Sequence, residues 1–249
     1  RNLKPVALEL GGKSANIICD TADVERALDG ALAGIYGNNG QACLAGSRIL
    51  VQRGIADAFI ERFVARSRKI KIGDPMLPST EIGPLAFEQH MQRVLSYVDV
   101  AKADGATLLT GGRRSPEHDK GWFIEPTAVL APGNDARVCQ EEIFGPFATF
   151  LTFDTVDEAV AIANASKFGL VSYVWTEDLS TAMRCARDIR AGTVWVNTAM
   201  IRDLRAPFGG YKESGIGRDG PQASLEFFTE LKATIIPIDP VKGHRYGAA

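Results

Sequence analysis

Two residues near the start of the chain could carry out covalent chemistry on a carbonyl group. Cys43 lies within the run from Asn39 to Leu44, and Glu9 lies within the run from Leu8 to Ser14. A cysteine attacks a carbonyl carbon as its thiolate, which is favoured by a partly exposed loop at the start of a helix. A carboxylate can relay a proton through a water molecule. The pair predicts a thiol nucleophile with a general base.

Each residue also has an ordinary structural interpretation when it is taken alone. A single cysteine in an apolar setting is more often an inert core residue, and Glu9 alone is more often a surface charge at a strand end. Cys19 and Cys185 fall in apolar or amphipathic patterns, and Cys139 lies close to acidic residues that disfavour a thiolate. Cys43 is therefore the preferred nucleophile among the four cysteines.

Three later segments follow these two runs in a fixed order, at residues 140–146, 207–212 and 214–218. The first contains Glu142 and Phe144 before a Gly-Pro pair, and the other two are rich in glycine. Together with the two earlier runs they resemble the NAD(P)-dependent aldehyde dehydrogenase superfamily. The resemblance covers the chain from about Leu3 to about Ile238.

The resemblance assigns roles at the centre of the reaction. It implies that the Cys43 thiolate attacks the aldehyde and that Glu9 activates the water that releases the acid. It also implies that Glu142 binds the nicotinamide ribose and that Phe144 packs against that end of the cofactor. Gly11 would let the backbone turn beside the nicotinamide.

Further assignments from the resemblance rest on position. His90 and Arg93 fall on the helix that contacts the adenosine-side ribose in the family, and Leu44 and Phe208 fall on the substrate side. The implied cofactor is NAD or NADP. The residues that would distinguish the two lie upstream of this chain in the family.

The segment between Asn197 and Pro207 lines the aldehyde tunnel in the family, and here it contains Arg202 and Arg205. Arginine can bind a carboxylate through two parallel hydrogen bonds. The segment resembles the muconate semialdehyde branch, including carboxymethyl-hydroxymuconate semialdehyde dehydrogenase, which oxidises acidic semialdehydes in aromatic catabolism. A surface network of Arg202, Asp203 and Arg205 is an equally weighted alternative.

Short apolar strands alternate with longer amphipathic helices along the chain, which predicts an α/β fold with a parallel sheet and helices on both faces. Active residues in open sheets of this kind gather beyond the carboxyl ends of the strands, where Glu9 and Asn197 are expected to lie. The expected helices cover residues 24–35, 55–69, 87–98, 156–165, 179–189 and 221–228. The expected strands cover residues 47–52, 107–110, 147–153, 170–175, 193–197 and 231–238.

The resemblance also predicts the domain organisation. Glu9 ends the nucleotide-binding domain in the family, so residues 1–12 are expected to close that domain, whose remainder is absent from this chain. Residues 13–230 would form the catalytic domain and residues 231–238 an oligomerisation strand, followed by a tail at 239–249. The implied assembly is a homodimer or homotetramer. By itself the chain is expected to be inactive as a dehydrogenase.

Composition excludes several functional classes. The 249 residues are 45% hydrophobic with a net charge of −2, and the basic residues form no long run, so nucleic acid is not an expected partner. No apolar stretch approaches the roughly 20 residues of a membrane-spanning helix. The four cysteines lack the spacing of a zinc site, and a reducing, cytoplasmic location is expected. The alternatives are a nucleotide-independent cysteine esterase or thioesterase and a non-catalytic assembly fragment.

Overall fold

The computed structural model describes residues 3–247 and is built around a seven-stranded sheet. Every neighbouring pair of strands is parallel except the first, which is antiparallel. In spatial order the strands are β4 (Thr107–Thr110), β5 (Thr127–Leu130), β6 (Phe147–Phe153), β3 (Arg48–Gln52), β2 (Ala15–Ile18), β8 (Val171–Trp175) and β9 (Thr193–Val196).

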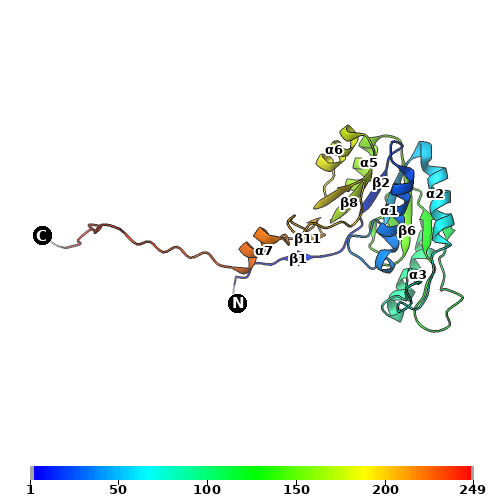
Figure 1. Cartoon of the computed structure of the whole chain (residues 1–249), viewed down its shortest axis with the longest axis horizontal. Helices are drawn as coiled ribbons and strands as arrows, with labels where there is room; N and C mark the ends of the chain where they lie inside the picture. The colour runs from blue at the N-terminus through cyan, green and yellow to red at the C-terminus, as the bar shows by residue number, and fades with distance from the viewer. Residues whose placement is uncertain (1–2, 248–249) are drawn as a thin grey trace.

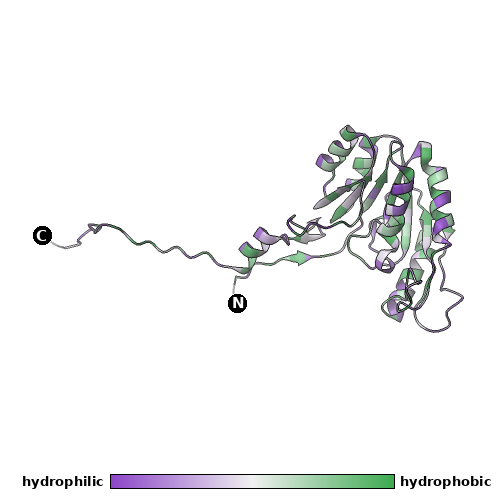
Figure 2. Cartoon of the chain, viewed as in Figure 1, coloured by the Kyte–Doolittle hydropathy of each residue, from purple (hydrophilic) through white to green (hydrophobic). Residues whose placement is uncertain are grey.

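Helices cover both faces of this sheet (Figure 1). The helices α1 (Val24–Tyr36) and α2 (Arg53–Ser67) pack on one face, with Ile49 and Val51 of β3. Leu50, between those two residues, faces the other layer. That layer contains α3 (Glu88–Ala103), α4 (Arg137–Gln140), α5 (Val156–Asn164) and α6 (Leu179–Asp188). The central strands are largely hydrophobic, whereas the helices alternate between hydrophobic and hydrophilic residues (Figure 2). The expected α/β architecture is confirmed.

The carboxyl ends and the amino ends of the parallel strands, here called the carboxyl edge and the amino edge of the sheet, carry different kinds of loop. Asp23, Thr155 and Asp178 are the N-caps of α1, α5 and α6, and each side chain accepts hydrogen bonds from the first turn of its helix. These caps lie just after the carboxyl ends of β2, β6 and β8, so short capped turns occupy that edge. The loops at the amino edge lead into the strands. Residues 41–47 lead into β3, and residues 141–146 lead from α4 into β6.

A separate arm extends from one side of the sheet (Figure 1). In it β1 (Leu8–Glu9) pairs antiparallel with β11 (Gly215–Ile216), and α7 (Pro221–Phe228) follows. A second short ribbon joins β7 (Phe168–Gly169) to β10 (Tyr211–Lys212). The pairing of these ribbons and the strands β2 and β5 were not predicted, because two- to four-residue strands are defined by their partners rather than by their own pattern.

The strand expected at residues 231–238 is not formed within the single chain. This segment runs on beyond α7 without regular secondary structure, and its apolar side chains are exposed. A strand needs a hydrogen-bonded neighbour, and none of residues 3–247 pairs with this segment. Pairing with a second subunit stays a prediction. Among residues 3–247, no helix has both the length and the apolarity that crossing a membrane requires.

Candidate active site

The predicted nucleophile lies at the amino edge of the central sheet. Cys43 occupies a turn between η1 (Gly37–Gly40), a short 3-10 helix, and the first residue of β3. Glu142 lies in the loop before β6, and Gly12 lies just before β2. Glu9 and Asn197 lie at the carboxyl ends of β1 and β9, as expected. Cys43 and Glu142 do not, because their loops lead into β3 and β6 and therefore lie at the amino ends of those strands.

Gly11 and Gly12 allow three segments to meet. A Cβ atom on Gly12 would lie 2.3 Å from the carbonyl oxygen of Cys43, and one on Gly11 would lie 2.3 Å from Oε2 of Glu142. The Gly12 N–H also donates to Oε1 of Glu142 at 2.9 Å. A side chain on Gly12 would push its segment away from the Cys43 backbone, and one on Gly11 would displace the Glu142 carboxylate. The glycines thus bring the thiol, the Glu9 strand and the Glu142 carboxylate to one place.

The surroundings of Cys43 differ from the expected helix start. Its turn leads into a strand, so no helix N-terminus lowers its pKa. Burial raises the pKa of the half-buried thiol, and the negative charges of Glu142 and Glu9 raise it further. The backbone N–H groups of Cys43 and Leu44 face the thiol and lower its pKa. These two donors could also hold an oxyanion that forms beside the sulfur.

The other three cysteines are buried, and burial strongly raises the pKa values of their thiols. Burial raises the pKa of Cys19 to about 12, and it raises the pKa values of Cys139 and Cys185 to about 11. For Cys139 the dominant cause is burial rather than the neighbouring glutamates that the sequence suggested. Cys43 is the one cysteine of the four with a partly exposed thiol.

Glu9 has the electrostatic character of a general base. Burial raises the pKa of its carboxyl group, and the negative charge of Asp219 raises it further, while Arg218 and Arg202 lower it. A carboxylate with a raised pKa is a stronger base near neutral pH. Glu9 also raises the pKa of Cys43, so the two side chains lie within electrostatic reach of each other.

The loop at 141–144 is held by one face of α3. His90 Nε2 lies 2.7 Å from the carbonyl oxygen of Phe144, and Arg93 donates to the carbonyl oxygens of Ile143 and Glu142 at 2.9 and 2.7 Å. Phe144 adopts a left-handed backbone conformation with φ of 63° and keeps its ring partly exposed. His90 and Arg93 therefore hold the loop through its carbonyl oxygens, a role that the sequence did not suggest. Their contact with a cofactor ribose stays a prediction.

The expected substrate residues line an apolar cluster beside the thiol. Leu44 and Phe208 pack in it with Cys43, and further members are Leu170, Val171, Tyr173, Trp195, Ala199 and Met200. The Arg202 guanidinium lies over the Phe208 ring, 4.5 Å from its centroid. Arg205 instead pairs with Asp203 at 2.6 Å, where both side chains are exposed. The proposed network of all three residues is thus formed only by its Asp203–Arg205 half.

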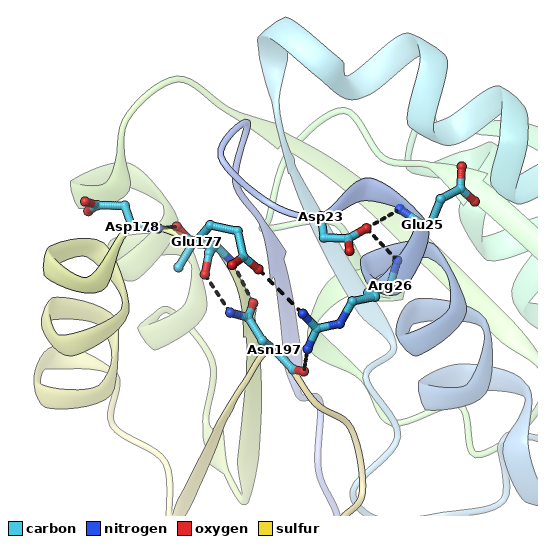
Figure 3. Close-up of polar contacts among 7 residues, drawn as sticks. Asp23, Glu25, Arg26, Glu177, Asp178 and Asn197 are labelled. Carbon is cyan, nitrogen blue, oxygen red and sulfur yellow. Dashed lines mark hydrogen bonds and ion pairs between the residues drawn. The ribbon is translucent and has the colours of Figure 1, made fainter.

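Asn197 has a structural role at the opposite edge of the sheet (Figure 3). Its side-chain amide donates to the Thr176 carbonyl and accepts from the Thr176 N–H, at 2.7 and 2.9 Å. Its own carbonyl oxygen accepts from Arg26, which also pairs with Glu177. Asn197 thereby anchors the start of the loop 198–206, which then returns toward Cys43.

Tyr173 and Trp195 were not identified from the sequence. They occupy partner positions on the parallel strands β8 and β9 and stack on each other beside the thiol. An aromatic residue near the middle of each of two successive strands is a sequence signal that could have indicated that the two rings pack together on one face of the sheet. Within residues 3–247, no group of three or more potential metal-ligating side chains is present.

Comparison with known proteins gives a consistent result. Residues 1–234 match the Aldehyde dehydrogenase family. The chain is 42% identical to betaine aldehyde dehydrogenase of Brucella anthropi over 96% of its own length and 50% of that protein. It is 45% identical to aldehyde dehydrogenase of Aspergillus niger over 93% of its length and 46% of that protein.

A solved structure agrees with the sequence relatives. The NAD+ complex of aldehyde dehydrogenase from Bacillus cereus superposes with a TM-score of 0.91 at 42% identity, covering 95% of this chain and 48% of that one. The chain therefore spans about half the length of the relatives it matches.

Proposed function

The chain belongs to the aldehyde dehydrogenase family, and on this premise we propose that it supplies the catalytic half of an NAD(P)-dependent enzyme that oxidises an aldehyde to a carboxylic acid. One observation carries the proposal. Cys43, Glu9 and Glu142 converge around Gly11 and Gly12, where a Cβ atom on Gly12 would meet the Cys43 backbone and one on Gly11 would meet the Glu142 carboxylate. A reactive thiol, a base and a second carboxylate are thereby held together at one edge of the sheet.

The residues of the chain fit a nicotinamide cofactor at this edge. Phe144 presents a partly exposed ring, and Glu142 is fixed through Oε1 with its other oxygen beside Gly11. In the proposed enzyme Glu142 would bind ribose hydroxyl groups and Phe144 would pack against the nicotinamide end. When bound, NAD(P)+ would accept the hydride that leaves the substrate carbon.

The chain's own groups account for the remaining steps. The Cys43 thiolate attacks the aldehyde carbon, and the N–H groups of Cys43 and Leu44 stabilise the resulting oxyanion. Loss of hydride converts this adduct to a thioester. Glu9 then takes a proton from water, the hydroxide adds to the thioester, and the carboxylic acid leaves as Cys43 recovers its proton. The same last step would support hydrolysis of activated esters.

The substrate is proposed to be a carboxylated semialdehyde. Arg202 lies beside the cluster that contains Cys43, and its positive charge lowers the pKa of Glu9. It forms no ion pair with a residue in the described part of the chain. A free guanidinium here favours a substrate carboxylate and disfavours a cationic aldehyde. Relatives named betaine aldehyde dehydrogenase thus need not share this substrate.

The substrate proposal is tested by comparing Arg202→Ala with Arg205→Ala in the complete native protein. Hydrogen bonds to charged groups are worth about 1.5–3 kcal/mol, so Arg202→Ala should lower kcat/KM for an acidic semialdehyde by about 10- to 100-fold. Arg205 already pairs with Asp203, so its replacement should have a smaller effect. A neutral aldehyde of similar size should be oxidised nearly as fast by Arg202→Ala as by the unmodified enzyme.

Equal losses for acidic and neutral aldehydes would contradict the substrate assignment. So would a preference of the unmodified enzyme for neutral or cationic aldehydes. The family membership would stand in either case, because it does not depend on Arg202.

A further inference from the structure

Tyr173 joins the central sheet to the loop that carries the nucleophile. Its side chain is fully buried, and its hydroxyl donates to the carbonyl oxygen of Leu44 at 2.7 Å. Its ring lies against the same loop, because a Cβ atom on Gly46 would come within 3.2 Å of it. Tyr173 thus contacts both the residue after Cys43 and the exit of the turn.

Trp195 makes the corresponding contact with the substrate loop. Its indole ring stacks on Tyr173 with a centroid distance of 5.1 Å and an interplanar angle of 21°. Its Nε1–H donates to the carbonyl oxygen of Ile201 at 2.8 Å, and Ile201 directly precedes Arg202. The two aromatic rings therefore stand between the nucleophile loop (residues 43–46) and the substrate loop (residues 198–206).

We infer that Tyr173 and Trp195 are positioning residues that set the separation between the nucleophile loop and the substrate loop. Both loops lack regular secondary structure, and Asn197 and Met200 hold left-handed backbone conformations with φ of 51° and 58°. The rings instead belong to adjacent parallel strands in partner register, which makes them a rigid spacer. The part that concerns the aldehyde rests on the proposed function.

Each ring has a distinct task. The Tyr173 hydroxyl fixes the Leu44 carbonyl and with it the neighbouring Leu44 N–H, which faces the Cys43 thiol. The Trp195 N–H fixes Ile201 and with it the start of the Arg202 side chain. An error of about 1 Å in such an arrangement can lower a reaction rate by about 100-fold. Removing one donor should therefore disturb one loop more than the other.

The experiment compares Tyr173→Phe with Trp195→Phe in the complete native protein. The first variant keeps the ring and removes one hydroxyl, so alkylation of Cys43 by iodoacetamide should slow by about 2- to 10-fold. Its pH profile should move to higher pH, because the Leu44 N–H that favours the thiolate is less well held. Trp195→Phe should alkylate within about twofold of the unmodified protein, yet its KM for the aldehyde should rise by about 2- to 10-fold with little change in kcat.

Two matched variants control for general loosening of the fold. Tyr36→Phe removes a buried hydroxyl that donates to Thr127, and Trp175→Phe removes a buried indole N–H that donates to Asn16. Neither donor forms a hydrogen bond with either loop, so both variants should keep the alkylation profile and the KM of the unmodified protein. Thermal unfolding of all four variants establishes that each is folded.

The outcomes separate this inference from the proposed function. An unchanged alkylation profile in folded Tyr173→Phe, or equal effects in the two control variants, would overturn the positioning role. If the unmodified protein oxidises no aldehyde but Tyr173→Phe still shifts the alkylation profile, the proposed function fails and the role of Tyr173 on Cys43 is supported.

Discussion

The thiol of Cys43 lies among groups that act on its ionisation in opposite directions. Burial and the charges of Glu142 and Glu9 disfavour the thiolate, and two backbone N–H groups favour it. The first set is the stronger, so the net effect raises the pKa of Cys43 above its ordinary value. Glu9, whose own pKa is raised, is the nearby base that could take up a proton as the thiolate forms.

Cys43 should be the cysteine that reacts fastest with iodoacetamide, because its thiol is half exposed whereas the other three are buried. The reactive form is the thiolate, so the rate should rise with pH. Because the pKa is raised, the midpoint should lie above the ordinary value for a cysteine. Peptide mapping after limited labelling at several pH values measures both features. Faster labelling of Cys19, Cys139 or Cys185 in folded protein would contradict the assignment.

At the scale of elements, α3 acts as a support for the Glu142 loop. His90 and Arg93 are one helical turn apart, and between them they bind three successive carbonyl oxygens. Tyr97, one further turn along, donates to the Glu141 carboxylate at 2.8 Å. This row of contacts explains how Phe144 can keep a left-handed conformation that is costly for an aromatic residue.

Arg93→Met should loosen the loop without removing a residue that touches the reacting atoms. The variant loses two charge-assisted hydrogen bonds, so in the complete native protein the KM for NAD(P)+ should rise by about 10-fold. Steady-state kinetics at saturating aldehyde measures this change. Gln92→Met is the control, since Gln92 is exposed and its side chain hydrogen-bonds to Glu88 on the same helix rather than to the 141–144 loop. Equal KM values in the two variants would refute the supporting role of Arg93.

At the scale of the whole molecule, the sheet body and the segment that follows α7 differ in how their apolar residues are used. In the body such residues are buried between sheet and helices. Beyond α7, Leu231, Ile235, Ile236 and Ile238 are at least 80% exposed. Apolar residues in such a row are covered in most folded proteins, which is why a neighbouring subunit is the expected partner.

Truncation of the complete native protein after Thr229 should therefore lower its oligomeric state. The expected result in light scattering is a smaller mass than that of the unmodified protein, because the apolar residues at 231–238 are lost. Truncation after Asp239 is the matched control and should leave the mass of the assembly unchanged apart from the deleted residues. An unchanged oligomer after the longer truncation would show that this segment does not hold the subunits together.

Much of the site and the fold could be predicted from local sequence. Cys43 and Glu9 lie in short runs whose residue types suit a thiol nucleophile and a base, whereas the role of Glu142 follows only from the resemblance of the combined segments to a known family. These roles stay predictions. The long helices and the main strands are visible because their apolar residues recur at helical spacing or form short runs bounded by turns. Both signals depend on residues that are neighbours in the chain, so they survive without any knowledge of the fold.

The tertiary structure alone decided how these pieces meet. It placed the thiol at the amino edge of the sheet, because the turn that contains Cys43 leads directly into β3. It gave His90 and Arg93 a loop to support, and it left residues 231–238 without a strand partner. The contact from Tyr173 to Leu44 spans 129 positions of sequence. Such contacts arise from strand order and register, which depend on the packing of the whole chain rather than on the pattern of any one segment.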